Sequence, residues 1–252
     1  MTFAIIPARW SSVRFPGKPL HPIAGKPLVQ HVWERCRESG AFDRTIVATD
    51  DPRIAAAASS FGAEVALTSP EHPSGTDRAA EVARQLPEES LIFNVQGDEP
   101  LISPLLLRDL ARELHRTPDI DLITAATVID LSEARNENVV KVVTDRNHNA
   151  LYFSRSVIPY AREGAALTYL KHLGIYGYRR DALLAFVDLE PSSLEQAERL
   201  EQLRALQNGM KIRVVVAATR SIGVDTREDA DVVEKIIRAV PGGSSAVRNE
   251  TS

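Results

Sequence analysis

Cysteine and long apolar runs are scarce in this sequence, and each absence excludes a class of protein. Cys36 is the only cysteine among 252 residues, so an intrachain disulfide is excluded, and a lone thiol suits a reducing compartment. Its helical spacing from Val29 and Val32 favours packing over catalysis. No segment is apolar enough to span a bilayer, and Arg9 comes too early for a secretion signal. We therefore expect a cytoplasmic protein with no membrane partner.

Net positive charge is also absent, because 30 Lys and Arg residues face 34 Asp and Glu residues, which gives a formal net charge of −4. General nucleic-acid binding requires a basic surface, so we expect no nucleic-acid partner. The first acidic residue is Glu34, and Arg9, Arg14, Lys18 and Lys26 all precede it without a neighbouring carboxylate. This cationic segment predicts an anionic ligand such as a polyphosphate, and the alternative is a solvated basic loop.

Patterns typical of strands and helices alternate along the first half of the chain. Four apolar residues, 3–6, predict a short buried strand, and the apolar face of 28–39 predicts a helix that Gly40 ends. Further strands are expected at 44–49, 64–68, 91–95 and 122–128. Three further helices are expected: one capped by Asp51, one capped by Thr76 or Asp77, and one that begins at Pro104. This alternation predicts an α/β fold with a doubly wound, mostly parallel sheet.

The second half departs from this alternation. Residues 139–145 and 150–155 alternate in hydrophobicity on either side of a turn, which predicts a β-hairpin and a mixed sheet. A long helix is expected from Ser193, with Gln196 at capping-box spacing and Gly209 at its end. The remaining expectations are strands at 171–178 and 211–219, a short helix from Asp181, and a last helix that Thr226 and Asp229 cap and that runs to about Val240. We expect one domain over residues 1–240 and a disordered tail at 241–252.

The loop after the first strand lacks the glycines of the two commonest phosphate-binding loops. A dinucleotide fingerprint needs closely spaced glycines, whereas the first glycine here is Gly17. A Walker A loop needs Gly-Lys followed by Ser or Thr, whereas Lys18 and Lys26 are both followed by proline. What remains is a long loop that surrounds an anion with Arg and Lys side chains and backbone amides.

Nine segments in order resemble the 3-deoxy-manno-octulosonate cytidylyltransferase (CMP-Kdo synthetase) family. They are IPARWSSVRFPGKPL (6–20), VATDD (47–51), HPSGTDR (72–78), NVQGDEPLI (94–102), VVKVVTD (139–145), ALYFSRS (150–156), HLGIYGY (172–178), LEQAERLEQLRAL (194–206) and GVDTREDA (223–230). The resemblance implies a Rossmann-like nucleotidyltransferase with a β-hairpin extension and a homodimer. Its implied activity is transfer of CMP from CTP to the anomeric hydroxyl of 3-deoxy-manno-octulosonate (Kdo), with release of pyrophosphate, for lipopolysaccharide biosynthesis.

Two carboxylates are candidates for a metal site. Asp98 follows a buried strand directly and faces the basic loop, and Mg²⁺ prefers one or two carboxylates together with phosphate oxygens and water. The resemblance implies Asp98 and Asp225 as the ligands of Mg²⁺. For Asp225 the spacing to Glu228 also fits a helix cap, so this alternative is open. Together with Lys18, the two carboxylates are the predicted catalytic residues.

The resemblance also assigns the residues that bind the two substrates. For CTP they are Ala8, Arg9, Arg14, Lys18, Ser74, Gly75, Arg78 and Gln96. For the sugar acid, within about 136–210, they are Arg155, His172, Tyr176, Glu195 and Gln196. Each assignment has a structural alternative, since Arg78 could pair with Glu81 and Glu195 could cap its helix. The sequence departs from the family at His148, where glycine is common, and at Val157, where proline is common.

Three other functions compete with this prediction. An 8-amino analogue of Kdo or a related nine-carbon sugar acid would leave the same motifs, because pocket shape distinguishes one substituent. A nucleotide-binding regulator on the same fold would have lost Asp98, Asp225 or Lys18, and all three are present. A nicotinamide oxidoreductase would need the glycine fingerprint that the first loop lacks.

Overall fold

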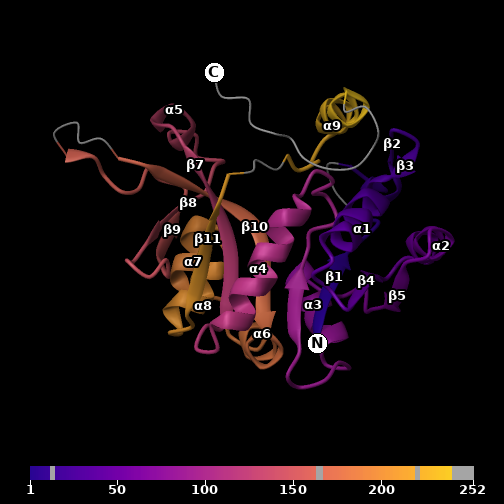
Figure 1. Ribbon diagram of the computed structural model, residues 1–252, viewed down its shortest axis with the longest axis horizontal. Coiled ribbons are helices and arrows are strands. Elements are labelled where there is room, and N and C mark those ends of the chain that lie inside the picture. Colours follow the sequence, from indigo (N-terminus) through magenta and orange to yellow (C-terminus); the bar gives the residue numbers. More distant parts are fainter. Residues whose placement is uncertain (12–14, 163–166, 219–221, 240–252) are drawn as a thin grey trace. The chain divides into compact units, whose positions relative to one another are not determined.

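A computed structural model describes residues 1–11, 15–162, 167–218 and 222–239 (Figure 1). The chain divides into two compact units, one of Met1–Arg108 with Thr219–Ser252 and one of Asp109–Ala218. The single domain over 1–240 stays a prediction, and the expected disordered tail at 241–252 lies outside the described residues. Over the described ranges, the helices are too short or too polar to cross a membrane.

The first unit is built on four parallel strands in the order β6-β1-β4-β5. Their bounds are Thr2–Pro7 for β1, Arg44–Thr49 for β4, Glu64–Leu67 for β5 and Leu91–Asn94 for β6. Strand β1 lies between β4 and β6, with Phe3 opposite Arg44 and Ile92. Residues Phe3 to Ile6 are fully buried, as the uninterrupted apolar run predicts for a central parallel strand.

The helices of the first unit begin and end largely where the sequence predicts. They are α1 (Leu28–Ser39), α2 (Pro52–Ser60), α3 (Gly75–Ala83) and α9 (Arg227–Ala239), with a short 3-10 helix η1 (Lys18–Leu20) and a small hairpin of β2 (Pro22–Ile23) and β3 (Lys26–Pro27). Helix α4 (Pro104–Arg116) contributes residues to both units. One prediction is wrong: α3 is capped by Ser74 and not by Thr76 or Asp77, because the Ser74 hydroxyl accepts hydrogen bonds from both of their N–H groups.

The second unit has a mixed sheet, as predicted. Its strands are β7 (Leu122–Ile129), β8 (Lys141–Thr144), β9 (Ala150–Ser154), β10 (Tyr169–Arg179) and β11 (Ile212–Ala217). Strand β7 pairs in parallel with β11 and antiparallel with β10, and β8 and β9 form the expected hairpin. In the hairpin turn His148 has a φ of 62°, the left-handed conformation that glycine adopts most readily, which agrees with the glycine that is common in the family at this position.

The helices of the second unit are short. They are α5 (Leu131–Ala134), α6 (Arg180–Val187), α7 (Ser193–Glu198) and α8 (Gln202–Gln207). The predicted long helix from Ser193 is therefore wrong, because Arg199 takes a left-handed φ of 56° and separates α7 from α8. Tertiary contacts decide this break: the carboxylate of Glu198 accepts hydrogen bonds from the Ser154 hydroxyl (2.6 Å) and the Arg155 N–H (2.9 Å).

Candidate active site

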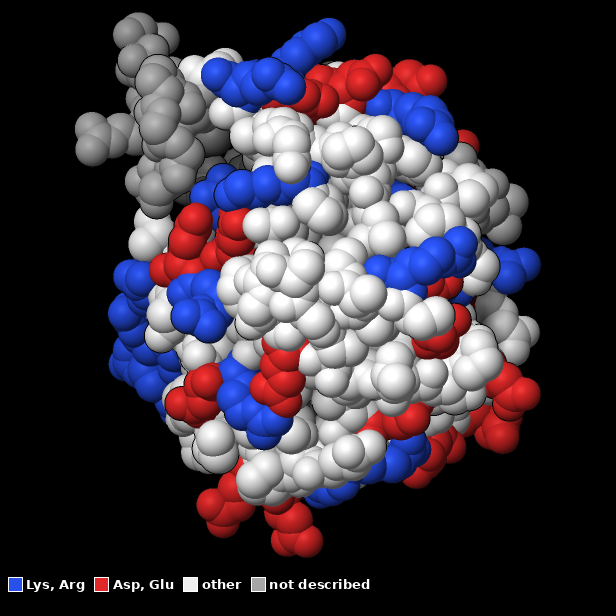
Figure 2. Space-filling view, turned by 90° about the vertical axis from the view of Figure 1, so that its right-hand side faces the viewer, with Lys and Arg blue, Asp and Glu red and all other residues white. Residues whose placement is uncertain are grey.

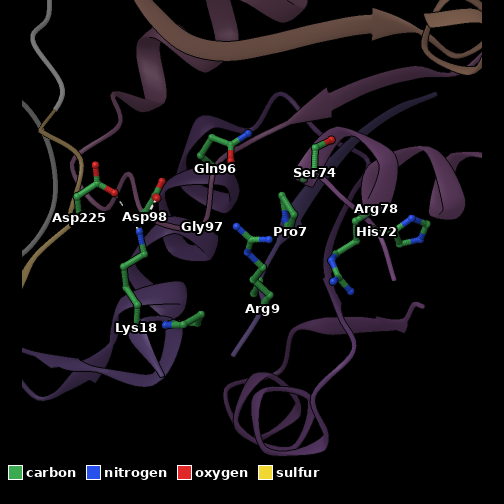
Figure 3. Close-up of a pocket in the computed structure, with 13 residues that line it drawn as sticks. Pro7, Arg9, Lys18, His72, Ser74, Arg78, Gln96, Gly97, Asp98 and Asp225 are labelled. Carbon is green, nitrogen blue, oxygen red and sulfur yellow. Dashed lines mark hydrogen bonds and ion pairs between the residues drawn. The ribbon is translucent and has the colours of Figure 1, made fainter. Parts of the chain in front are cut away.

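A cavity of about 230 Å³ lies in the first unit (Figure 3). It is lined by Pro7, Ala8, Arg9, Lys18, Pro19, His72, Ser74, Gly75, Arg78, Gln96, Gly97, Asp98 and Asp225. Every predicted CTP-binding and catalytic residue that the structure describes is therefore in one place. Arg14, the remaining one, lies outside the described residues. Pro7, Pro19, His72 and Gly97 were not predicted as site residues, although all four lie inside the motifs quoted for the family.

The carboxyl ends of two neighbouring parallel strands form the floor of this cavity. Pro7 ends β1 and the turn Gln96-Gly97-Asp98 follows β6, and parallel neighbours end at the same sheet edge. The turn packs so closely on β1 that a Cβ at Gly97 would lie 2.8 Å from the Pro7 carbonyl oxygen. Glycine at this position therefore fixes the approach of Asp98 to the cavity.

Lys18 connects the two predicted catalytic carboxylates. Its Nζ donates to Asp98 Oδ2 at 2.7 Å and to the Val224 carbonyl at 2.8 Å, and lies 3.5 Å from Asp225 Oδ1. Figure 3 shows the three charged side chains meeting at one end of the cavity. The Lys18 side chain is mostly buried, whereas that of Asp225 is 55% exposed, so the cluster opens to solvent on the Asp225 side.

An apolar cluster explains how the segment at 224–225 reaches a loop more than 200 residues away in the sequence. Phe15 of the cationic loop and Val224 are buried together with Leu28 of α1 and Val233 of α9. The Val224 N–H also donates to the Asp98 carbonyl at 2.8 Å. Burial of these side chains and this backbone bond hold Asp225 beside Lys18.

The capping alternative for Asp225 is wrong. Helix α9 is capped by Thr226 together with Asp229 of its first turn. The Asp229 N–H donates to the Thr226 hydroxyl (3.2 Å), and the Thr226 N–H donates to the Asp229 carboxylate (2.8 Å). This is the pair that the sequence predicted as the cap. The Asp225 N–H also donates to Asp229 (2.9 Å), so the carboxylate of Asp225 is turned toward the cavity and Lys18 instead.

The donor set of this cluster fits a magnesium ion. Asp98 and Asp225 present carboxylate oxygens to one cationic group, and Mg²⁺ is held in nucleotide enzymes by one or two carboxylates with phosphate oxygens and water. Over the part of the chain that the structure describes, there is no group of three or more His, Cys, Asp or Glu side chains that could hold a metal ion. A metal at Asp98 and Asp225 would thus depend on the phosphates of a bound nucleotide for further ligands.

The opposite end of the cavity is formed by α3 and the loop before it. Arg78 is 3% exposed and pairs with Asp50 at 2.8 Å and with the Thr68 hydroxyl, so the alternative pairing with Glu81 is wrong. Glu81 pairs instead with His72, and this hydrogen bond lowers the pKa of Glu81. Asp50, the partner of Arg78, and His72, which lines the cavity, were not predicted as site residues, although both belong to quoted motifs.

Charges of both signs are interspersed on the face shown in Figure 2. Several surface charges are paired, for example Lys26 with Glu34 at 2.8 Å and Arg35 with Glu38 at 3.1 Å. This distribution agrees with the net charge of −4. The cationic side chains that line the cavity are therefore a local feature.

The predicted sugar-binding residues all belong to the second unit. Arg155 is fixed by hydrogen bonds from its Nε to the Glu198 carbonyl (2.8 Å) and from its Nη1 to the Glu137 carbonyl (3.3 Å). His172 and Tyr176 lie side by side, with ring centroids 5.4 Å apart. The β10–β7 register is irregular between Leu173 and Tyr176, so β10 is not a regular strand over the four residues that separate the two rings.

Glu195 caps its helix, which was the structural alternative to sugar binding. It forms a capping box with Ser192, one residue earlier than predicted, and its Oε2 lies 3.1 Å from Nε of Arg204. The Gln196 side chain is exposed, and its Nε2 lies 3.5 Å from the Pro191 carbonyl, which is a long contact. Of these two neighbours, Gln196 is thus better placed to bind a ligand.

His172 is held as a neutral imidazole. Burial lowers its pKa to about 3. The hydroxyl of Thr124 donates to the Ile175 carbonyl (2.7 Å) and therefore accepts from Nε2 of His172 (2.9 Å). The ring proton consequently lies on Nε2, and Nδ1 is the acceptor.

This state of His172 predicts a pH dependence of stability. The unfolded chain binds a proton at this residue below about pH 6.5, whereas the folded chain does so only near pH 3, so stability falls as the pH drops from 6.5 toward 3. His172→Gln should lose less stability on acidification, by up to about 1.4 kcal/mol per pH unit. Urea unfolding at pH 7 and pH 5 measures this, with His148→Asn at the exposed hairpin turn as control. Identical pH dependences in the wild type and His172→Gln would contradict a neutral His172.

Comparison with known proteins agrees with this geometry. The sequence pattern of the family described as cytidylyltransferase matches residues 3–212. The 3-deoxy-manno-octulosonate cytidylyltransferase of Geobacter metallireducens is 51% identical over 249 residues, covering 93% of this chain and 97% of the relative. The protein of the same name from Myxococcus xanthus is 47% identical over 242 residues, covering 96% of this chain and 98% of the relative.

A solved structure has the same fold over nearly the whole chain. It is CMP:2-keto-3-deoxy-manno-octonic acid synthetase complexed with CTP, with a TM-score of 0.91 and 42% identity, covering 94% of this chain and 98% of that one. Sequence and structure thus agree along the chain and not only at the motifs. The chain belongs to the 3-deoxy-manno-octulosonate cytidylyltransferase family of Rossmann-like nucleotidyltransferases.

Proposed function

We propose that this protein transfers CMP from CTP to the anomeric hydroxyl of Kdo and releases pyrophosphate. The observation that carries the proposal is the meeting of Lys18, Asp98 and Asp225 at one end of a cavity whose other end holds Arg78. Charges of both signs on three separate segments suit a reaction in which a polyphosphate and a divalent cation are bound together. Family membership supports both substrates, since the relatives are named for this reaction.

The end of the cavity that holds Lys18, Asp98 and Asp225 is assigned to the triphosphate and the metal ion. Lys18 and Arg9 supply positive charge for the β- and γ-phosphates and for the departing pyrophosphate. Asp98 and Asp225 are assigned as the ligands of Mg²⁺. When bound, this ion supplies neutralisation of the α-phosphate and lowers the pKa of the attacking hydroxyl. With both carboxylates holding the ion, Lys18 would pair with phosphate oxygens in place of Asp98 and Asp225.

The opposite end is assigned to the nucleoside. Asp50 fixes the guanidinium of Arg78, and the amide of Gln96 offers one donor and one acceptor to a base or ribose. The hydroxyl of Ser74 caps α3 by accepting from the N–H groups of Thr76 and Asp77, so its contribution is to fix the start of that helix at the cavity wall. In the second unit, Arg155 is assigned to the sugar carboxylate and His172, Tyr176, Glu195 and Gln196 to the sugar hydroxyls.

Release of pyrophosphate is the direct test. Protein, CTP and Mg²⁺ are incubated with and without Kdo, and pyrophosphate is measured with a coupled phosphate assay. We expect release only when all three additions are present, and none when EDTA removes the metal or when UTP replaces CTP. Absence of Kdo-dependent release would overturn the proposal, and release without Kdo would indicate a CTP pyrophosphatase.

Two neighbouring functions are separated by the same assay. If 8-amino-Kdo gives the higher kcat/KM, the substrate is that analogue, and the assignment of the sugar residues is retained. A nucleotide-binding regulator would bind CTP in calorimetry but release no pyrophosphate with either sugar. We also propose a homodimer, which light scattering on the purified protein tests. We propose a cytoplasmic location as well, and microscopy of a fluorescent fusion tests it.

A further inference from the structure

Two residues at the base of the cationic loop are in direct contact. Trp10 follows Arg9, and Gly17 precedes Lys18, so the pair brackets the loop between the two cavity-lining cations. The Gly17 N–H donates to the Trp10 carbonyl at 3.0 Å. A Cβ at Gly17 would lie 3.0 Å from Cη2 of the indole, so the ring lies against the backbone of Gly17, which has a φ of 73°. The loop is thus closed at its base by a hydrogen bond and a ring contact.

The indole is also covered by an arginine from another element. The guanidinium of Arg53, in the first turn of α2, lies 3.4 Å from the centroid of the Trp10 ring, which is the distance of a stacked cation–π contact. Asp51 holds this guanidinium in a bidentate pair, with Nε to Oδ1 at 2.9 Å and Nη2 to Oδ2 at 2.6 Å. Asp51 is itself fixed, because it caps α2 by accepting from the Arg53 N–H.

The order of contacts therefore runs from α2 through Asp51, Arg53 and Trp10 to Gly17. Neither Trp10 nor Arg53 lines the cavity. Their neighbours along the chain do, since Arg9 and Lys18 are assigned to the triphosphate in the proposed function, on which this inference rests. A loop whose base was free would have to be ordered when the nucleotide binds, and that ordering would weaken affinity.

We propose that Trp10 is a positioning residue for the triphosphate, and that Arg53 acts through it to hold Arg9 and Lys18 in place before CTP arrives. We call the contacts of Arg53 and Gly17 with the Trp10 ring the clamp, and the ion pair of Arg53 with Asp51 is its fixed side. The Arg53 side chain is 55% exposed, so it is not part of the buried core, whereas that of Asp51 is 11% exposed. Substitutions at Arg53 therefore change the stack without opening the core.

The test measures CTP binding by calorimetry without Kdo, and then the steady-state constants. We expect Trp10→Leu to raise the Kd and KM for CTP about tenfold with kcat within about twofold, and Trp10→Tyr, which keeps an aromatic face, to stay within about threefold of the wild type. Arg53→Gln should raise the Kd about threefold. Because Arg53 acts through the indole, it should add nothing to the effect of Trp10→Leu.

The chain contains its own matched control. Its other tryptophan, Trp33, is also covered by an arginine, with Arg37 at 5.4 Å from the ring centroid, on α1 and away from the cavity lining. Arg37→Gln should leave the Kd for CTP unchanged. In a Trp33→Phe background Trp10 is the remaining tryptophan, so its fluorescence should change with Arg53→Gln and with CTP.

Three outcomes would contradict the proposed role of Trp10 and Arg53. They are an unchanged Kd in Trp10→Leu, an equal loss in Trp10→Tyr and Trp10→Leu, and full additivity of Arg53→Gln with Trp10→Leu. If the wild type itself bound no CTP, the proposed function would fail instead, so the two failures are distinguishable. Circular dichroism of each variant identifies any that does not fold, and Arg53→Gln then carries the test, since its side chain is largely exposed.

Discussion

Asp98→Asn is expected to reduce Kdo-dependent pyrophosphate release by about a hundred- to a thousandfold. The substitution removes one negative charge but keeps an oxygen that can accept from Lys18, whose Nζ lies 2.7 Å from Oδ2. The loss should therefore appear in kcat, because the charge that positions a divalent cation is gone, while the fold is retained. Initial rates of pyrophosphate release and thermal unfolding together measure both effects.

Glu34→Gln is the matched control for Asp98→Asn. Glu34 also pairs with a lysine of the same unit, Lys26 at 2.8 Å, but it does not line the cavity. Its removal should leave kcat and KM unchanged, as expected for an exposed ion pair. Near-normal activity in Asp98→Asn, or an equal loss in Glu34→Gln, would show that Asp98 is not a metal ligand in the reaction.

Lys18→Met is expected to lower kcat/KM for CTP by about a hundred- to a thousandfold, because a cation is removed from the position where the charge of pyrophosphate develops. It should also lower the free energy of unfolding by about 1–3 kcal/mol, since the ammonium joins Asp98 and Val224 of two distant segments. Rates of pyrophosphate release and urea unfolding measure the two effects separately.

Lys26→Met is the control for the lysine. It removes a cation from the same opening segment, but one that pairs with Glu34 at the surface. We expect activity and stability close to the wild type. A similar loss of activity in both lysine variants would mean that the loop acts by general electrostatic attraction; that outcome would remove the specific role assigned to Lys18.

Two of the failed sequence predictions have one physical origin. Local capping and periodicity predict a long helix from Ser193, whereas Glu198 contacts Ser154 at the end of β9 and Arg155 directly after it, and α7 ends at Glu198. Helical spacing predicts Glu81 as a partner of Arg78, whereas its partner in the structure is Asp50, directly after β4. Local patterns contain no information about such neighbours.

What the sequence by itself determined is the order of strands and helices and the family. Periodicity, the cap at Asp51 and the glycine after α1 are local features, and a helix or strand forms from local geometry, so these predictions agree with the structure. The tertiary structure alone decided which of two roles Asp225 has. Burial of Phe15 with Val224 brings Asp225 to Lys18, 207 residues away in the sequence, and leaves the cap of α9 to Thr226 and Asp229. That choice depends on packing between distant segments, which no local pattern encodes.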